Sequence, residues 1–305
     1  MLTRSQQSTR TQPAGRPRLA KPRQTMAGGK RTRARLLRLL WYPPLLVIAI
    51  SILFPILWMI YSSFKPQDAI FANVFALPTK VYLGDYDILF GTGGTMLRWM
   101  ANSTLISFLS SAGIVVCACT IAYGLATFDF RGKQVLFFVC LLGLMVPETT
   151  VVIPGYLLIS ELHLVNTPWA LILTYCGWSS FGVLVLRNFF ESTPKDLREA
   201  AVVDGAGHWY VFTRVMLPLA RPAVATVAIF GFLWVWNDFV YPLIYLTANS
   251  SFTVPLGVAQ YYSRAGINIG AQMAALTIAA VVPLIVFLVF QRHFVRGLLS
   301  GAVKS

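Results

Sequence analysis

Long apolar segments without a charged residue constrain this chain more than any other feature of its sequence. The first runs from Trp41 to Phe64, and a stretch of that length without Asp, Glu, Lys or Arg can cross a bilayer as a helix. Further apolar segments follow, so the sequence predicts an all-α polytopic membrane protein, in agreement with a mean hydropathy of +0.66. Six transmembrane helices are predicted, at about residues 41–64, 99–128, 135–160, 167–186, 223–246 and 267–291.

Two of the predicted spans carry features that bear on packing. The third is interrupted at Pro147-Glu148 and again at Pro154-Gly155. A broken helix is tolerated in a membrane only where protein or a water-filled cavity surrounds the freed backbone groups. The second span contains small residues that suit close approach of helices in lipid, namely Ser103, Ser107, Ser110, Ser111 and Gly113.

Basic residues are concentrated at the N-terminus. Residues 1–40 hold eleven Lys or Arg and no acid, within a formal net charge of +14 for the whole chain. We expect this tail to be disordered and to fix the orientation of the chain, with binding to anionic lipid headgroups as the alternative. No folded basic surface accompanies the charge, which argues against a nucleic-acid partner.

The remaining Lys and Arg predict the orientation of the spans. If the N-terminus is cytoplasmic, that side holds 21 of these residues and the outer loops hold 4; without the tail the numbers are 10 and 4. The positive-inside rule therefore places both termini and the polar loop at 187–222 in the cytoplasm. The predicted organisation is a basic tail at 1–40, a transmembrane domain at 41–296 and a cytoplasmic C-terminal tail at 297–305.

The loop at 187–222 is polar and helix-prone, unlike the segments on either side. Thr193 as a cap, Pro194 in the first turn and Asp196 as the partner of a capping box predict a helix start. Gly205 and Gly207 then allow that helix to end and the chain to turn.

A second short helix is expected from His208 to Met216, ended by Leu217-Pro218. The expected product is a compact helix–turn–helix on the membrane surface. Its exposed face would be available to another protein.

The spacing within this loop resembles the coupling loop of ABC importer permeases. The family pattern of Glu-Ala-Ala, a Gly, an aliphatic residue and Leu-Pro reads here as Glu199-Ala200-Ala201, Gly205, Val215 and Leu217-Pro218. In that family the loop docks into a cleft of a separate ATPase. The resemblance implies a type I permease fold, with a cytoplasmic coupling helix between the fourth and fifth spans. It also implies these ATPase-coupling residues: Glu199, Ala200, Ala201, Asp204, Gly205, Ala206, Leu217 and Pro218.

Other stretches resemble the carbohydrate-uptake branch of the family, in particular its maltose-type second permease. The likeness covers roughly residues 40–305. The stretches that carry it are Pro194-Lys195-Asp196-Leu197, Trp236-Asn237-Asp238-Phe239 with Pro242-Leu243, and Gly297-Leu298 through Gly301-Ala302-Val303-Lys304.

This likeness implies a pathway for a sugar or oligosaccharide in the bacterial cytoplasmic membrane. The implied partners are a second homologous permease, two cytoplasmic ATP-binding subunits and an extracytoplasmic substrate-binding protein. The last outer loop, at about 247–266, would meet the binding protein. Glycerol phosphates and polyamines are alternative solutes within the same family.

No motif for covalent chemistry accompanies the spans. Gly28-Gly29-Lys30 lacks the earlier Gly of a phosphate-binding loop, and Arg31 occupies the position of its Ser or Thr. We therefore expect a transport subunit that is not an enzyme and binds no cofactor, with ATP and magnesium held by the partner ATPase. The four cysteines lie in apolar segments and the three histidines lie far apart, so neither a disulfide framework nor a metal site is expected.

Two acids and several aromatic residues fall within the predicted spans. A lone carboxylate in hydrocarbon is costly, so an acid there ordinarily marks a pathway or a paired partner. For Glu148, cavity lining and a local hydrogen bond both stay open, whereas Asn237 and Asp238 fit a structural hydrogen-bonding role. Trp and Tyr near membrane interfaces are usually anchors, and in the maltose-type system that this chain resembles the partner permease holds the sugar. With sugar contact as the alternative to anchoring, the aromatic candidates are Trp234, Trp236, Tyr241, Tyr245, Tyr261 and Tyr262.

An ion-coupled secondary transporter or channel that uses Glu148 and Asp238 is the alternative class of protein. Such transporters often carry internal repeats, and no repeat is visible in this sequence. They also need no loop for docking a partner. A membrane enzyme is disfavoured because no catalytic constellation is present.

Overall fold

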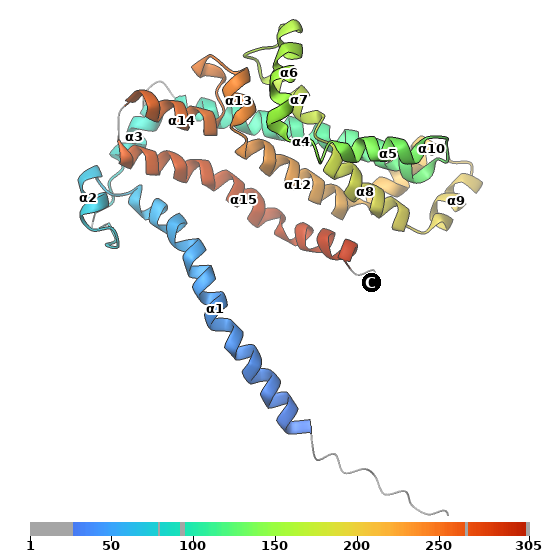
Figure 1. The fold of residues 1–305 in the computed structure, drawn as a ribbon, viewed down its shortest axis with the longest axis horizontal. Helices are drawn as coiled ribbons and strands as arrows, with labels where there is room; N and C mark the ends of the chain where they lie inside the picture. The colour runs from blue at the N-terminus through green and yellow to red at the C-terminus, as the bar shows by residue number, and fades with distance from the viewer. Residues whose placement is uncertain (1–26, 79, 92–94, 266–267, 303–305) are drawn as a thin grey trace, which may run out of the picture. The chain divides into compact units, whose positions relative to one another are not determined.

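The computed structural model describes the backbone of residues 27–78, 80–91, 95–265 and 268–302. These parts are helices joined by turns and short loops, and they contain no strand (Figure 1). Contacts divide the chain into two units, Met1–Pro55 and Ile56–Ser305. The described part of the first unit is the beginning of a single helix, and the packing that follows is that of the second unit.

The helices before the polar loop are α1 (Ala27–Ser62), α2 (Gln67–Ala72), α3 (Gly84–Gly91), α4 (Thr95–Thr127), α5 (Lys133–Leu142), α6 (Glu148–Glu161), α7 (Pro168–Cys176) and α8 (Ser180–Ser192). The later elements are α9 (Lys195–Val203), α10 (His208–Tyr210), the π-helical turn η1 (Val211–Met216), α11 (Leu217–Leu219), α12 (Arg221–Asn237), α13 (Val240–Tyr245), the 3-10 turn η2 (Asn249–Ser251), α14 (Val254–Ala265) and α15 (Ile269–Ala302).

The described residues supply three to five membrane spans by length and composition. Trp41–Ser62 of α1, the whole of α4 and Ile269–Gln291 of α15 are each long and apolar enough. Two bent pairs pass the same test together, α7 with α8 at 41° and His208–Leu219 with α12 at 78°. The predicted count of six is not confirmed, because the predicted third span is divided between α6 and α5, a helix of only 10 residues.

The expected disorder of residues 27–40 is wrong, and two further segments outside the predicted spans contain helix. Helix α1 begins at Ala27, so residues 27–40, which were expected in a disordered tail, are helical; residues 1–26 lie outside the described part. Helix α15 continues to Ala302 and takes in most of the predicted C-terminal tail. The predicted loop at 247–266 contains η2 and α14, whose buried Val254, Leu256 and Val258 anchor it.

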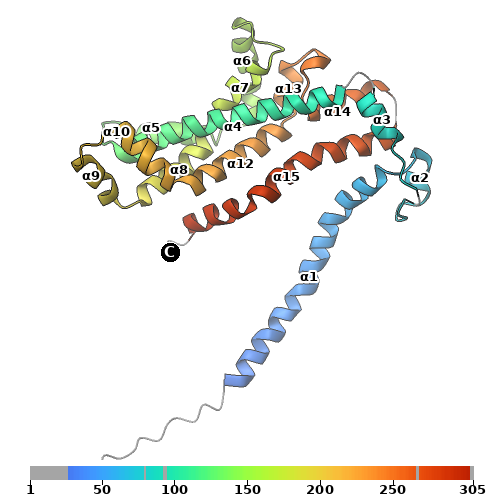
Figure 2. The same cartoon turned by 180° about the vertical axis from the view of Figure 1, so that it is seen from behind.

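Helix α4 is the element around which the second unit packs. It contacts α7, α8, α12 and α14, and Figures 1 and 2 both show it beside α8 and α12. The Ser111 hydroxyl donates to the carbonyl oxygen of Ala228 on α12 at 2.7 Å, and the Ser103 hydroxyl accepts from the Val254 amide at 2.8 Å. Close approach through small residues is confirmed by the burial of Ser103, Ser107, Ser110 and Ser111.

The contact of α8 with α4 and α12 requires a residue without a side chain. A Cβ at Gly182 of α8 would lie 2.7 Å from the Ala118 Cβ on α4 and 2.8 Å from Cγ1 of Val227 on α12. These distances are shorter than van der Waals contact. Glycine therefore sets how closely the three helices approach.

Three of the interruptions between helices of the second unit lie at residues 143–147, 177–179 and 238–239. Pro147 is the N-cap of α6 and forces the preceding residue out of helical conformation. Pro242 has no amide to donate to the carbonyl of Asp238, which favours the break between α12 and α13. Pro154 lies inside α6, and the second interruption predicted there is wrong, because neighbouring groups in a bundle can compensate for one missing hydrogen bond.

Candidate functional site

The polar loop predicted between the spans forms a helix–turn–helix over residues 193–220, called here the α9 loop. Helix α9 has Pro194 as its N-cap, and no side chain caps its first turn. The Thr193 hydroxyl donates instead to the carbonyl oxygen of Phe189 at 3.0 Å, a backbone interaction that Thr often makes. The predicted capping box is therefore wrong. Asp196 remains in the first turn, where a negative charge suits the helix dipole.

The end of α9 follows the prediction for Gly205. The Gly205 amide donates to the carbonyl of Val202 at 3.0 Å, and the Ala206 amide donates to the carbonyl of Ala201 at 3.0 Å. This pair of bonds is the Schellman motif, which needs a left-handed residue after the helix. Gly205 supplies it with φ +86°.

The second arm of the α9 loop continues further than predicted. Helix α10, the π turn and α11 form one helical run from His208 to Leu219, so Leu217-Pro218 does not stop it. The π turn resets the hydrogen-bond register just before Pro218, which then lies in the first turn of α11, where a missing amide costs little. The chain turns instead at Ala220, between this run and α12.

The inner face of the α9 loop packs on the end of the helical bundle. The ring of Phe212 in the π turn lies 4.8 Å from the ring of Tyr123 on α4, and Phe190 of α8 lies 5.8 Å from the same ring. The His208 ring lies 5.1 Å from Phe128, which follows α4. Phe212 and His208 thus join the α9 loop to the end of α4, and Phe190 joins that end of α4 to α8.

The outer face of the α9 loop is exposed at one end of the bundle, as both views of the ribbon show. Val203 is 85% exposed and Trp209 is 72% exposed. Exposed apolar side chains of this size on a small rigid element are typical of a surface that another protein covers. Of the predicted coupling residues, four are exposed and four partly buried: first Glu199, Ala200, Asp204 and Gly205, then Ala201, Ala206, Leu217 and Pro218.

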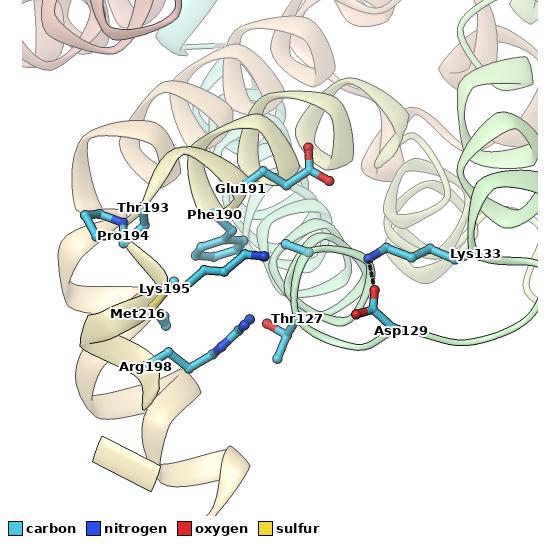
Figure 3. Close-up of a pocket in the computed structure, with 11 residues that line it drawn as sticks. Thr127, Asp129, Lys133, Phe190, Glu191, Thr193, Pro194, Lys195, Arg198 and Met216 are labelled. Carbon is cyan, nitrogen blue, oxygen red and sulfur yellow. Dashed lines mark hydrogen bonds and ion pairs between the residues drawn. The ribbon is translucent and has the colours of Figure 1, made fainter. Parts of the chain in front are cut away.

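A polar pocket of about 240 Å³ lies where the α9 loop meets the ends of α4, α5 and α8 (Figure 3). Lys195 and Arg198 of α9 line it together with Thr127. On its rim Lys133 pairs with Asp129 at 3.1 Å. The hydrogen bond and the charge of Lys133 lower the pKa of Asp129, with smaller effects from Lys195 and Arg198. This pocket was not predicted from the sequence.

A second polar site lies where the three interruptions meet. A Cβ at Gly143 would clash with the Ser180 hydroxyl, which brings the first interruption against the second. The Tyr241 hydroxyl donates to the carbonyl oxygen of Glu148 at 3.4 Å, which joins the third to the first. We call the following residues the break cluster: Glu148, Trp178, Trp234, Asp238 and Tyr241.

Asp238 has a structural role within the break cluster. One carboxylate oxygen accepts the hydroxyl hydrogen of the buried Tyr175 at 2.5 Å, and the other accepts the amide of Val240 at 3.1 Å. The second bond forms an Asx-type turn just ahead of α13. Glu148 lies close enough to Asp238 for the two acids to interact electrostatically.

Aromatic rings line the break cluster. The ring centres of Trp178 and Trp234 are 4.9 Å apart, and Tyr241 lies 5.2 Å from Trp178. Trp234 is 42% exposed, Asn237 is exposed beside it, and Tyr241 is buried. The structure thus brings the predicted Glu148, Trp234, Asp238 and Tyr241 together. Trp178 was missed, because its sequence position gives no sign of which aromatic rings it meets.

Comparison with known proteins assigns the family. Residues 114–300 match the family model for the binding-protein-dependent transport system inner membrane component, and this range includes both polar sites. The chain belongs to this family. It is therefore a permease-family protein of the inner membrane with several membrane-crossing helices, and a self-sufficient ion-coupled transporter is not supported.

Curated relatives of this permease are similar over most of its length. The "probable ABC transporter permease protein YurM" of Bacillus subtilis (strain 168) is 35% identical over 86% of this chain and 87% of its own. The diacetylchitobiose uptake system permease protein NgcG of Streptomyces coelicolor is 34% identical over 85% of this chain and 87% of its own.

The fold is shared with a solved transporter. A chain in the crystal structure of a bacterial ABC transporter that imports the acidic polysaccharide alginate aligns with a TM-score of 0.76, over 85% of this permease and 97% of that chain. The identity is 21%, so this likeness concerns the fold alone.

Proposed function

We propose that this permease is one membrane subunit of an ATP-driven importer of sugars or oligosaccharides, and that its α9 loop is the contact through which a separate ATPase drives it. The observation that carries the proposal is the α9 loop itself. It is an exposed helix–turn–helix whose inner face is packed on the end of α4.

The sugar class is supported by the relatives. Besides the diacetylchitobiose permease, they include the arabinooligosaccharide permease AraQ of Halalkalibacterium halodurans, 33% identical over 85% of this chain. A substrate class shared by relatives of this similarity is the best guide to the solute of this permease. A second permease, two ATP-binding subunits and an extracytoplasmic binding protein would complete the complex, as in other binding-protein-dependent systems.

Rigid attachment supports the coupling role. The Schellman motif fixes the end of α9, and the π turn of the second arm contacts Tyr123 of α4. We expect a partner that moves α9 to move α4 through this contact, and α8 through the Thr193 hydroxyl, which binds the Phe189 carbonyl. Glu199 and Asp204 on the outer face offer negative charge to that partner.

The proposal is tested by reversing the charge of Glu199. In proteoliposomes that contain the whole transporter and its binding protein, Glu199→Lys should abolish the stimulation of ATP hydrolysis by substrate, because a like charge would be forced into the docking cleft. The matched control is Glu161→Lys, which makes the same change at an exposed glutamate ending α6.

The control should keep wild-type stimulation, and both variants should reach the membrane at wild-type levels. Wild-type stimulation in Glu199→Lys would contradict the coupling role of the α9 loop. Equal loss in both variants would show that charge reversal anywhere in the subunit is disruptive and would also contradict it.

A further inference from the structure

We propose that the break cluster is the segment of the solute pathway contributed by this subunit, and that it admits an uncharged sugar and repels anionic solutes such as uronates. The inference rests on the proposed transport function and adds a solute class to it. The observation behind it is a tilted pair of indole rings, one of them exposed, beside two acids at the meeting point of three helix interruptions.

The surroundings of the break cluster do not suit lipid. Its exposed edge carries Asn237 and the partly exposed Glu148 and Asp238. Polar and charged groups within membrane helices face a cavity or a partner, because hydrocarbon cannot solvate them. The interruptions at 143–147 and 177–179 also leave backbone groups outside regular helix, which is tolerated only where protein or water covers them. Water or a neighbouring subunit's cavity therefore lies against this face.

The rings suit a sugar. Trp178 and Trp234 are tilted by 38° at a centre distance of 4.9 Å, and Trp234 keeps 42% of its surface open. A flat apolar face beside hydrogen-bonding groups fits a pyranose ring, which has C–H groups on its faces and hydroxyls at its rim. Asn237 lies one helical turn from Trp234, so both occupy the same side of α12.

The charges set the solute class. Glu148 and Asp238 are the two acids of the site, and both oxygens of Asp238 accept hydrogen bonds, an arrangement that suits a carboxylate. The sequence has no Lys or Arg at residues 143–186 or 222–246, which include every interrupted segment that forms the cluster. No cation on these segments compensates the two acids. An anionic solute would meet uncompensated repulsion, which is strong where water is scarce.

Charged thiol reagents of similar size test this inference without knowledge of the natural solute. Asn237→Cys is placed in the complete transporter in membrane vesicles. It is treated with cationic trimethylammonioethyl methanethiosulfonate or anionic sulfonatoethyl methanethiosulfonate, with and without ATP and vanadate. The labelling rate of the wild-type complex is subtracted from that of the variant, and the difference is the rate at residue 237. To correct for intrinsic reactivity, this rate is divided by the rate at which the same reagent reacts with a small thiol in solution.

The cationic reagent should react on the order of tenfold faster than the anionic one after this correction. The preference should fall toward one when Glu148→Gln and Asp238→Asn are added. Equal corrected rates, or no reaction of residue 237 in either nucleotide state, would overturn the inference. Phe108→Cys, on an apolar exposed face of α4, should not react; reaction as fast as at residue 237 would also overturn it.

Failure of the inference and failure of the proposed function are distinguishable. Substrate-stimulated ATP hydrolysis is measured in the same vesicles. Charge-selective labelling without ATP stimulation would leave the acidic pathway segment standing and contradict ATP coupling. Normal stimulation of ATP hydrolysis without charge-selective labelling would contradict the acidic pathway segment and leave ATP coupling standing.

Discussion

Gly205 holds a backbone conformation that other residues adopt only with strain. Its φ of +86° allows two backbone hydrogen bonds to close the end of α9, and open space surrounds the position of a Cβ. The left-handed conformation costs an ordinary L-residue about 1–2 kcal/mol, and a β-branched residue more, whereas Asn tolerates it well. The requirement at this position therefore concerns the backbone and not the space.

Gly205→Val and Gly205→Asn separate these two requirements. Gly205→Val should strain or unwind the turn after α9 and reduce substrate-stimulated ATP hydrolysis by at least about tenfold, as expected for a cost above 1.4 kcal/mol at the docking surface. Gly205→Asn should retain most of the stimulation, since it fills the same space with a tolerant residue. Equal loss in both variants would mean that the partner needs the bare glycine surface.

Individual residues in the α9 loop show what sequence can and cannot specify. The turn at Gly205 was predictable, because few residues adopt a positive φ and the helix pattern ends there. The capping at the start of α9 was not predictable. The Thr193 hydroxyl can bond either to the α9 amides or to the Phe189 carbonyl, and only the packed structure shows which bond forms. The π turn ahead of Pro218 could not be predicted from the sequence pattern.

At the scale of helices, small residues determine how closely α4, α8 and α12 pack. Without a hydrophobic driving force between helices in lipid, stability comes from close contact of backbones and from hydrogen bonds between helices. Gly182 provides such a contact, and Ser111 provides such a bond. An added methyl group at the contact must push helices apart.

Gly182→Ala and Gly124→Ala add the same methyl group, the first at a tight helix contact and the second in open space. Gly182→Ala should destabilise the subunit by about 1–3 kcal/mol through overpacking against Ala118 and Val227. Gly124→Ala, where nothing lies within 4 Å of the added Cβ, should be neutral or stabilise by up to about 1 kcal/mol. Thermal unfolding in detergent measures both. A similar Tm for the two variants would show that the bundle relaxes around Gly182.

Helix interruptions were only partly accessible from the sequence. Proline marked the break at Pro147, yet Pro154 sits inside α6 without breaking it. The difference depends on whether neighbouring elements supply compensating contacts, which a local pattern does not reveal. Hydropathy located the long spans α4 and α15, but it could not show that the third apolar segment is divided.

At the scale of the whole subunit, the two ends of α4 face different surroundings. Its 33 residues correspond to about 50 Å, which exceeds the hydrocarbon core of a bilayer. At its start Asn102 donates to the carbonyl of Ser250, and at its end Thr127 lines the pocket beside α9. The residues at these two ends should therefore lie on opposite sides of the membrane.

Cysteine labelling with a membrane-impermeant maleimide checks this orientation. Gln134→Cys, exposed at the α9 end, should react in inverted vesicles and not in intact spheroplasts, because the positive-inside rule places that end in the cytoplasm. Ser250→Cys, exposed at the other end, should show the reverse pattern. Labelling of both from the same side would contradict the orientation and, with it, the access of the α9 loop to a cytoplasmic ATPase.

The meeting of the three interruptions has a mechanical consequence. Regular helices resist bending because every turn is held by its own hydrogen bonds, whereas short non-helical stretches can change their backbone angles freely. We therefore expect residues 143–147, 177–179 and 238–239 to act as hinges, and contacts bring these three interruptions together. A push delivered to α8 and α12 from the α9 end would be absorbed there, so the rings and acids beside the hinges would change position while the helices on either side kept their shape.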